Sequence, residues 1–260
     1  MNQPLAYVHP QAKIANNVVI EPFVTVHKNV EIGEGTWIGS NVTIMEGAKI
    51  GKNCRIFPGA VISAVPQDLK FGGEESLAII GDNTTIRECV TINRGTSYSG
   101  RTEIGENCLI MAYSHIAHDC HIGDHAIIVN SVQLGGHIEI GEWAIIGGLT
   151  AIHQFVKIGK HCMISGGSLV RKDVPPYIKA AREPLSFVGI NSVGLRRRGY
   201  ESEKIREIQN IYRTIFQSKL NNTQALDKLE AECAVSPERD EIIDFIRNSG
   251  RGIMKGYNQN

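Results

Sequence analysis

An imidazole and a carboxylate stand next to each other in this chain, at His118 and Asp119. Histidine has an ordinary pKa of about 6.5, so it can act as a general base near neutral pH, and an adjacent carboxylate can orient its ring. Two further histidines, His137 and His153, and a glycine, Gly136, follow along the chain. A glycine leaves its backbone N–H open to a developing oxyanion. Together these groups could activate a hydroxyl group that the substrate supplies, without a nucleophilic serine.

A six-residue repeat indicates how these distant residues are brought together. From Val8 to Val170, every sixth residue is aliphatic except Asp68, Glu74 and Tyr98. An α-helix repeats about every 3.6 residues and a strand every 2, so neither explains this period. A parallel β-helix does, because each of its three flat faces takes about six residues and each coil about 18. We therefore expect a mainly β protein, built as a parallel β-helix of hexapeptide repeats.

The winding predicts which side chains meet. Residues one coil apart lie above one another, which places His118, Gly136 and Gln154 in one column. Asp119 and His137 share the neighbouring column. We therefore expect one cluster from three successive coils, formed by His115, His118, Asp119, Gly136, His137, His153 and Gln154.

A structural role at a subunit interface would explain any one of these histidines, whereas the set together favours a functional site. The alternative chemistry is a zinc site, because imidazoles between solenoid subunits hold zinc in the γ-type carbonic anhydrases of this fold. Those enzymes resemble an HxxxxH arrangement, whereas this chain has His115-x-x-His118-Asp119. We therefore expect no metal and no other cofactor.

Two segments interrupt the repeat, at residues 64–77 and 95–101. The first contains proline, glycine and charged residues, so we expect it to project as a loop and to carry binding residues.

Glycine often follows the aliphatic residue, as at Gly33 and Gly51, and we expect it to permit the tight backbone at each corner. Four cysteines share one position of the repeat with alanine and valine, and we expect them to be buried free thiols: Cys54, Cys108, Cys120 and Cys162.

The repeat stops at residues 173–176, and a helical period follows. We expect helices from about Ser202, which would cap the first, from Thr223 to Cys233, and from Ser236 onward. The predicted organisation is a β-helix domain at 1–184, with its projecting loop at 64–77, followed by a C-terminal α-helical domain at 185–260. The helical domain is expected to close the open end of the solenoid.

Composition excludes several classes of partner. The chain has 27 basic and 27 acidic residues and a formal net charge of zero, so no overall field favours nucleic acid. No apolar run is long enough to cross a membrane, and the first residues lack the pattern of a signal peptide. We expect a cytoplasmic protein without stable membrane insertion.

The run His115-Ile116-Ala117-His118-Asp119-Cys120 resembles the signature of the bacterial UDP-N-acetylglucosamine 3-O-acyltransferases, which begin lipid A synthesis. The resemblance covers nearly the whole chain, and hexapeptide repeats alone would be a much weaker signal. Further segments similar to this family are residues 67–70 (QDLK), 92–96 (INRGT), 135–137 (GGH), 151–155 (AIHQF), 173–177 (DVPPY) and 194–200 (GLRRRGY).

The resemblance implies a left-handed parallel β-helix that forms a homotrimer with sites between subunits. It also implies transfer of a 3-hydroxyacyl chain from acyl carrier protein to the 3-hydroxyl of UDP-N-acetylglucosamine. In this family His118 would be the general base, Asp119 its orienting group and Gly136 N–H the oxyanion donor. His137 would hold the acyl hydroxyl or thioester region.

The remaining site residues are also implied by the resemblance. Gly166 corresponds to a position where a bulky side chain favours short acyl chains, so glycine there predicts a long 3-hydroxyacyl chain. Arginine suits the pyrophosphate of the sugar nucleotide because its planar fork makes paired bonds to phosphate oxygens. The expected contacts to the nucleotide sugar are Asp68, Lys70, His115, His153, Gln154, Asn191, Arg197 and Arg198. An acidic carrier protein would need a basic patch, for which the candidates are Lys157, Lys160, Arg171, Lys172, Lys179 and Arg182.

This chain departs from the family pattern at two positions, and other functions stay open. Asn93 stands where well-known members carry another histidine, and Val193 stands where an acid is common. One alternative is another hexapeptide acyltransferase, either the N-acyltransferase of the same pathway or an acetyl-CoA enzyme. The N-acyltransferases have a separate N-terminal domain, whereas the repeat here begins at Val8. The other alternative is a zinc hydratase or a non-catalytic trimeric scaffold.

Overall fold

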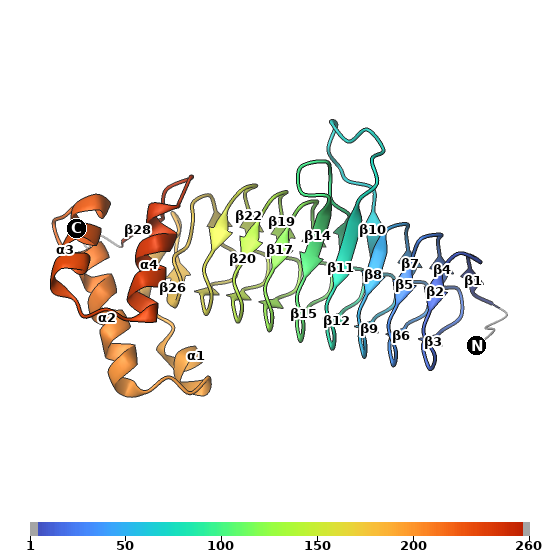
Figure 1. Ribbon diagram of the computed structural model, residues 1–260, viewed down its shortest axis with the longest axis horizontal. Helices are drawn as coiled ribbons and strands as arrows, with labels where there is room; N and C mark the ends of the chain where they lie inside the picture. Colours follow the sequence, from blue (N-terminus) through green and yellow to red (C-terminus); the bar gives the residue numbers. More distant parts are fainter. Residues whose placement is uncertain (1–4, 257–260) are drawn as a thin grey trace.

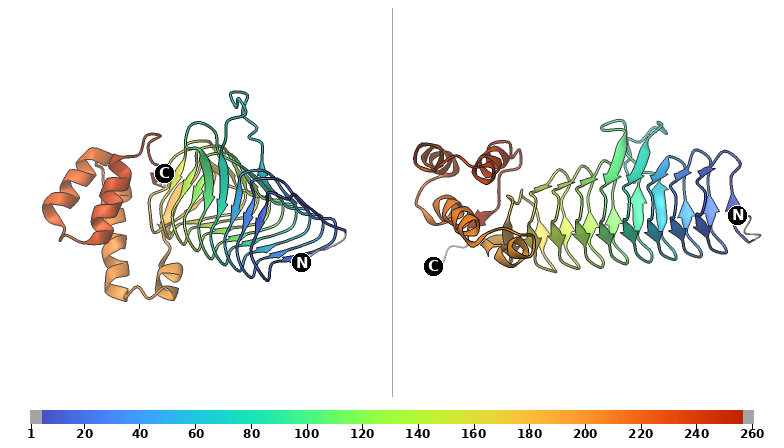
Figure 2. Two further views of the ribbon diagram at one scale, coloured as in Figure 1. Left: turned by 45° about the vertical axis from the view of Figure 1, so that its right-hand side comes forward. Right: turned by 60° about the horizontal axis from the view of Figure 1, so that its bottom comes forward.

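The computed structural model describes residues 5–256 and consists of a long three-sided prism with helices at one end (Figure 1). Successive coils stack along the prism, and each coil contributes one strand to each of three sheets (Figure 2). The strands of the coils pair in parallel, whereas β26 and β27 at the end of the third sheet pair antiparallel. The predicted parallel β-helix is therefore confirmed.

The first sheet contains nine short strands. They are β1 (Tyr7–Val8), β4 (Thr25–Val26), β7 (Thr43–Ile44), β10 (Val61–Ala64), β13 (Thr91–Asn93), β16 (His115–Ile116), β19 (Gln133–Leu134), β22 (Ala151–Ile152) and β25 (Leu169–Val170).

The second sheet contains eight strands. They are β2 (Lys13–Ile14), β5 (Glu31–Ile32), β8 (Ala48–Ile50), β11 (Leu77–Ile80), β14 (Arg101–Ile104), β17 (His121–Ile122), β20 (Glu139–Ile140) and β23 (Lys157–Ile158).

The third sheet contains eleven strands and runs past the last coil. They are β3 (Val19–Ile20), β6 (Trp37–Ile38), β9 (Arg55–Ile56), β12 (Thr85–Ile86), β15 (Leu109–Ile110), β18 (Ile127–Ile128), β21 (Ile145–Ile146), β24 (Met163–Ile164), β26 (Ile178–Ala181), β27 (Ser186–Ile190) and β28 (Lys255–Gly256).

The register explains why the six-residue phase survives the interruptions. Most strands pair with the strand 18 positions away, as Ile116 does with Leu134. Across the projecting loop Ile62 pairs with Ile92, and across the second excursion Ile80 pairs with Ile104. The two insertions therefore add 12 and 6 residues, both whole multiples of the repeat. The aliphatic residues keep pointing into the core, where Ile62, for example, is fully buried.

The corner glycines have a different role from the one expected. Gly33 and Gly51 do not have the positive φ that only glycine adopts easily. Instead, a Cβ atom on Gly33 would lie 2.7 Å from backbone atoms of Gly51 in the next coil. The positive φ occurs two residues later in each turn, for example at Asn53. Close stacking of coils, rather than backbone conformation, therefore requires glycine at this position. The expected burial of Cys54, Cys108, Cys120 and Cys162 is confirmed.

In the part of the chain that the structure describes, four helices follow the coils: α1 (Ser192–Arg197), α2 (Ser202–Gln217), α3 (Asn222–Glu232) and α4 (Pro237–Arg247). The three predicted helices are present, but Glu201, rather than Ser202, occupies the cap position of α2 and makes no side-chain cap bond. The helix α1 was not predicted. The division at 184/185 stays a proposal, because β26 and β27 extend the third sheet on both sides of it. The outermost residues of both proposed domains, 1–4 and 257–260, lie outside the described residues.

Candidate active site

The turns between strands form three edges of the prism, which we name by the sheets they join. Edge 1–2 contains residues 117–120, 135–138 and 153–156, and edge 2–3 contains residues 141–144 and 159–162. Edge 3–1 contains residues 147–150 and 165–168. These edges decide which of the predicted site residues a single chain can bring together.

His118 and Asp119 form a hydrogen-bonded pair on edge 1–2. Their Nδ1 and Oδ2 atoms are 2.7 Å apart, and the Asp119 side chain has no exposed surface. Asp119 has a φ of 58°, the left-handed conformation that recurs in the turns of this prism. Because a carboxylate accepts, Nδ1 of His118 donates to it, and Nε2 carries the lone pair that can take a proton. The pair therefore has the geometry of a general base with its orienting group.

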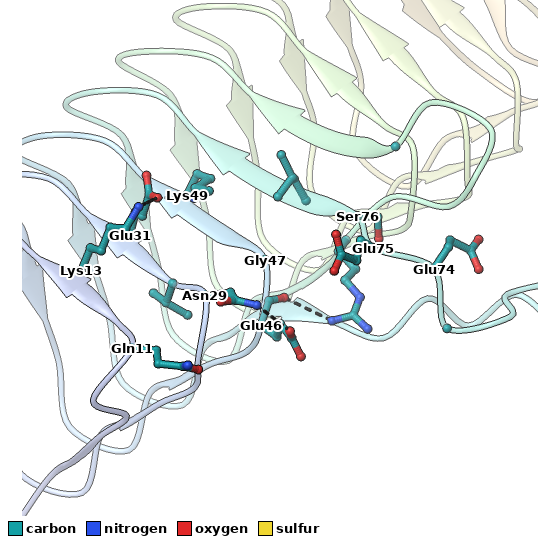
Figure 3. Close-up of a pocket in the computed structure, with 15 residues that line it drawn as sticks. Gln11, Lys13, Asn29, Glu31, Glu46, Gly47, Lys49, Glu74, Glu75 and Ser76 are labelled. Carbon is teal, nitrogen blue, oxygen red and sulfur yellow. Dashed lines mark hydrogen bonds and ion pairs between the residues drawn. The ribbon is translucent and has the colours of Figure 1, made fainter.

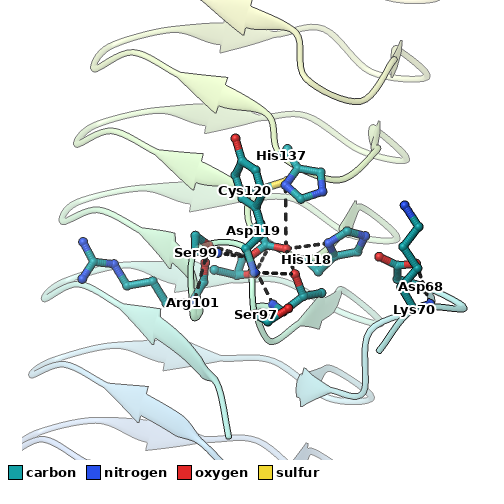
Figure 4. Close-up of polar contacts among 12 residues, drawn as sticks. Asp68, Lys70, Ser97, Ser99, Arg101, His118, Asp119, Cys120 and His137 are labelled. Atoms are coloured by element: carbon teal, nitrogen blue, oxygen red, sulfur yellow. Dashed lines mark hydrogen bonds and ion pairs between the residues drawn. The ribbon is translucent and has the colours of Figure 1, made fainter. Parts of the chain in front are cut away.

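Several donors converge on the Asp119 carboxylate (Figure 4). Thr96 approaches with its N–H at 3.1 Å and its hydroxyl at 2.7 Å, and Ser99 with its N–H at 3.2 Å and its hydroxyl. Burial alone would raise the pKa of this carboxyl, but hydrogen bonds from Ser99, His118 and Thr96 outweigh it and lower the pKa to about 2. Asp119 is therefore ionised throughout the neutral range.

Gly136 lies one coil from His118 and in contact with its ring. A Cβ atom on residue 136 would be 2.6 Å from Cε1 of His118 and 2.8 Å from Nε2. Only glycine leaves room for the imidazole in this position. The backbone N–H of His137 donates to the His118 carbonyl, and the backbone N–H of Phe155 donates to the Gly136 carbonyl.

His137 completes the cluster above the dyad. Its ring stacks on Phe155 at 4.3 Å and meets the edges of His118 and Tyr98. Its Nδ1 atom is buried and has no hydrogen-bond partner within residues 5–256, although Oδ2 of Asp119 lies 3.8 Å away. Burial lowers the pKa of His137, against the opposing charge of Asp119. The fold therefore favours the neutral form of the His137 ring.

Nitrogen and oxygen atoms of His118, Asp119 and His137 all lie within 4.8 Å of one another, so a metal ion was considered for this position. Both carboxylate oxygens of Asp119 already accept hydrogen bonds from Thr96 and Ser99. A metal would have to displace these donors and the bond to His118. The arrangement therefore fits an acid–base pair better than the zinc alternative.

His115, His153 and Gln154 lie near the dyad on the same side of the prism. His115 starts β16, and its Nδ1 is 2.7 Å from the hydroxyl of Thr91; burial and the charge of His118 lower its pKa. His153 and Gln154 are exposed, and Nδ1 of His153 lies 3.1 Å from the Gln154 carbonyl. His153 and Gln154 are therefore exposed side chains at the rim, whereas His115 is half-buried on the first sheet.

The projecting loop brings Asp68 and Lys70 toward the same edge (Figure 4). Asp68 accepts a hydrogen bond from the Lys70 amide at 3.0 Å, and the charges of both side chains act on the pKa of His137. A groove of about 610 Å³ opens beside the dyad on the face of the second sheet, lined by residues that include Tyr98, His137 and Phe155. The loop and this groove flank the dyad from two sides.

Comparisons with known proteins fit this geometry. Residues 173–254 match the family model described as Udp N-acetylglucosamine O-acyltransferase, Domain 2, and residues 101–136 match the bacterial transferase hexapeptide (six repeats). An acyl-[acyl-carrier-protein]–UDP-N-acetylglucosamine O-acyltransferase of Sulfurihydrogenibium sp. is 53% identical over 251 residues, which cover 96% of this chain and 93% of the relative. The chain belongs to this acyltransferase family.

Two further proteins support the assignment. The Trichlorobacter lovleyi acyltransferase of the same name is 49% identical over 96% of this chain and 98% of its own. The crystal structure of LpxA, a UDP-N-acetylglucosamine acyltransferase from Bacteroides fragilis, superimposes with a TM-score of 0.95 at 53% identity, covering 98% of this chain and 100% of that one. The expected left-handed winding and C-terminal helical region are confirmed by this likeness. Residues 2–98 match a model described as the GMPPB C-terminal domain, so the N-terminal coils alone would not identify the acyltransferase.

Four predicted site residues of the acyltransferase do not join the cluster within one chain. Gly166 lies on edge 3–1, with Gly148 O only 2.9 Å from the position of a Cβ atom. Asn191 and Arg198 belong to edge 2–3: Asn191 donates to the His161 carbonyl at 2.9 Å, and the Arg198 guanidinium lies over Trp143 at 5.0 Å. Arg197 is exposed on the adjoining helix α1.

The basic residues considered for carrier binding do not form one patch. Lys157 belongs to the second sheet and Lys179 to the third. Lys160, on edge 2–3, pairs with Glu241 at 3.0 Å, and Arg171, after β25, pairs with Glu183 at 3.2 Å. The one-patch interpretation was wrong, because successive strands and turns of a coil lie on different faces and edges of the prism. Smaller groups remain: Arg171 and Lys172 with Lys255, and Lys157 with Arg101 and Arg251.

Sequence reasoning missed the residues that hold Asp119. Thr96 and Ser99 lie in the excursion between β13 and β14, and neither residue was predicted to contact Asp119. Its position was the available signal, because this six-residue insertion occurs in the coil directly before Asp119. Tyr98, one of three breaks in the aliphatic series, packs against His137 at 4.4 Å.

One further groove contains none of the predicted site residues. A groove of about 540 Å³ lies at the base of the projecting loop and is lined by charges that include the ion pair of Lys13 and Glu31 (Figure 3). Within residues 5–256, no helix combines the length and apolar character needed to cross a bilayer.

Proposed function

We propose that this acyltransferase moves a 3-hydroxyacyl chain from acyl carrier protein to the 3-hydroxyl of UDP-N-acetylglucosamine, the first step of lipid A biosynthesis. The observation that carries the proposal is the contact of His118 with both Asp119 and Gly136. The names of the relatives supply the donor, the acceptor and transfer to oxygen. A hydroxyl acceptor needs the general base that this dyad provides.

The reaction then follows from the arrangement. Nε2 of His118 takes the proton of the sugar hydroxyl while its oxygen attacks the thioester carbonyl. The Gly136 N–H, which makes no backbone hydrogen bond among the described residues, stabilises the tetrahedral oxyanion. Collapse breaks the carbon–sulfur bond, and the imidazolium returns the proton to the departing thiolate. Asp119 stabilises the imidazolium during the intermediate stage.

A homotrimer is part of the proposal, and the chemistry of the three faces supports it. The second sheet presents ion pairs to its outside, such as Glu139 with Lys157 at 2.9 Å. The third sheet presents uncharged residues over several coils, including Leu109, Ile127 and Ile145. The first sheet presents uncharged residues and His115 in the same coils. Packing the first sheet of one subunit on the third sheet of the next buries both of these faces and leaves the charged sheet in water.

This packing also accounts for the scattered site residues. Edge 1–2 of one subunit, with His118, would lie beside edge 2–3 of the next, with Asn191 and Arg198. Edge 3–1, with Gly166, would face the three-fold axis, at the inner end of a channel between the two sheets. The sugar nucleotide would bind at the outer rim, and the acyl chain would extend inward along the channel. The assignment to substrate binding of the remaining predicted residues rests on the same arrangement: Asp68, Lys70, His115, His137, His153, Gln154 and Arg197.

A cytoplasmic location is proposed as well. All six cysteines are free, and four are buried where oxidation would disturb the core. Free thiols in this number favour a reducing compartment.

The test is transfer from 3-hydroxyacyl carrier protein to UDP-N-acetylglucosamine by the wild type and His118→Ala. Loss of the base should lower the rate by roughly 10²–10⁴-fold. His27→Ala is the control, because His27 is an exposed histidine on the same edge, several coils toward the N-terminus. A His118→Ala enzyme with wild-type activity would refute the proposed mechanism. Wild-type protein that transfers no acyl chain to this acceptor would refute the substrate assignment.

A further inference from the structure

The excursion between β13 and β14 wraps around the buried side of the catalytic dyad. Its residues Thr96 and Ser99 both reach the Asp119 carboxylate, each with a backbone N–H and a hydroxyl. We infer that Thr96 and Ser99 are positioning residues, which fix Asp119 as an ionised acceptor against His118 and thereby set the pH at which the dyad can act as a base. The inference rests on the proposed role of His118.

Thr96 is the stronger of the two holders. It is buried, its hydroxyl donates to Asp119 Oδ2 at 2.7 Å, and the same oxygen accepts the Tyr98 amide at 3.2 Å, which fixes the direction of its proton. The Ser99 hydroxyl lies near both Asp119 Oδ1 and the Arg101 carbonyl, at 2.8 Å from the latter. Because a hydroxyl has one proton, Ser99 can donate to only one of these acceptors at a time.

The excursion is held in place by contacts of its own. Its hydrogen-bond donors are therefore already positioned before the substrate binds. The Ser97 amide donates to Glu74 Oε1 at 2.9 Å, which ties the excursion to the projecting loop. Tyr98 packs over His137. The hydroxyl of Thr102 accepts the Asp119 amide at 2.9 Å from the adjoining strand. The carboxylate is therefore held in place from its backbone as well as from its oxygens.

The donors matter because of how a buried carboxylate shares a proton with its neighbour. A carboxylate without donors is a stronger base, and it would stabilise the protonated form of His118 more. Each donated hydrogen bond makes the carboxylate a weaker base, so the dyad as a pair can still accept a proton from a substrate at a lower pH. Removing a donor should therefore raise the pKa of the dyad and move the acidic limb of the pH–rate profile to higher pH.

Other charges face the dyad and remain unchanged in the test. His137 and His115 are held toward their neutral forms by burial. Glu74 interacts with Asp119 through its charge, and Asp68 and Lys70 act on His137 with opposite signs. Substitutions at Thr96 and Ser99 alter none of these groups, so a shift of the acidic limb of the pH–rate profile reports on the hydrogen bonds to Asp119.

The experiment compares pH profiles of kcat/KM for the wild type, Thr96→Val, Thr96→Ser and Ser99→Ala. Thr96→Val should move the acidic limb upward by about one pH unit and lower the rate at pH 6 by about tenfold. Thr96→Ser keeps the hydroxyl and should restore the wild-type limb, and Ser99→Ala should move it by less than Thr96→Val. Ser97→Ala is the matched control, because Ser97 contributes its amide rather than its hydroxyl.

A purely structural role would lower the plateau of Thr96→Val and leave the limb where it is in the wild type, and that result would overturn the inference. If Thr96→Val does not fold, judged by circular dichroism, an unmoved limb in Ser99→Ala overturns it equally. Failure of the proposed function would differ, because His118→Ala would then retain activity. An inactive His118→Ala with unmoved limbs would refute this inference alone.

Discussion

The imidazole of His118 occupies the space where residue 136 would carry a Cβ atom. The distance from that position to Cε1 is 2.6 Å, shorter than any real Cβ contact. The His118 ring can occupy this space only because residue 136, in the next coil, is glycine and has no side chain. The same glycine keeps its N–H next to the base, where a tetrahedral oxyanion would form. In the proposed mechanism this close approach would bring the base and the oxyanion donor to the same reacting carbon.

Gly136→Ala should reduce catalysis while leaving the fold intact. Its φ is in the ordinary range, so the new methyl group meets the His118 ring rather than straining the backbone. The ring must rotate away from Asp119, which weakens the bond between Nδ1 and Oδ2. We expect kcat to fall by roughly 10²-fold, toward the value for loss of the base. Steady-state assays measure the fall, and the melting temperature serves as the control. Wild-type kcat in a folded variant would contradict the geometry.

How much of this site could be read from the sequence depends on the kind of contact. Contacts one coil apart, such as His118 with Gly136, follow directly from the six-residue period. Contacts across an insertion do not, because the period gives no path for the inserted residues; Thr96 and Ser99 reach Asp119 in this way. The period also cannot show which edge of a second subunit faces the dyad.

The C-terminal region was predictable in part for a similar reason. The helix α2 has a strong apolar face with Ile205 and Ile208 buried, so its period is visible. The short helix α1 has one buried residue, Leu195, and therefore no period to detect. The motif around Arg198 could be associated with a binding role only through the family resemblance.

Gly166→Met should shorten the preferred acyl chain. Gly166 lies on edge 3–1, and in the proposed trimer a longer side chain there would extend into the channel between subunits. A Cβ atom would come within 2.9 Å of the Gly148 carbonyl, so the local backbone must shift slightly to admit the side chain. A blocked channel admits fewer methylene groups, and each excluded group costs about 0.8 kcal/mol of apolar burial. Assays of wild type and variant with 3-hydroxyacyl carrier proteins of graded chain length measure the preference. An unchanged preference would show that the chain does not pass Gly166.

His161 should make the fold sensitive to mild acid. Burial and the charges of Arg198 and Lys160 lower its pKa to about 4, whereas the unfolded chain has the ordinary value of about 6.5. Between these values the unfolded state binds a proton that the native state does not, so stability falls as the pH decreases. The expected loss from this residue between pH 7 and pH 5 is about 2 kcal/mol.

In His161→Gln the loss of unfolding free energy that His161 causes between pH 7 and pH 5 should be absent. Denaturant unfolding of both proteins at pH 7 and pH 5, at equal protein concentration, gives the two differences in unfolding free energy. The difference should be smaller in the variant by about 2 kcal/mol. The absolute stability of the variant is not the readout, because glutamine also loses the ring stacking on Tyr177. Equal pH dependence in the two proteins would mean that His161 is not held neutral by the fold.

Mixing two inactive variants should restore activity if the site is shared between subunits. His118→Ala removes the base from edge 1–2, and Arg198→Ala removes the expected pyrophosphate contact from edge 2–3. When the two proteins are unfolded together in equal amounts and refolded, about one cleft in four combines an intact His118 with an intact Arg198. Roughly a quarter of the wild-type rate should return, whereas each variant refolded alone stays inactive. If a single chain holds the whole site, every cleft keeps one defect and no activity returns. Edge 1–2 and edge 2–3 lie on opposite sides of the second sheet of one chain. The recovered fraction of the wild-type rate therefore distinguishes a site shared between two subunits from a site within a single chain.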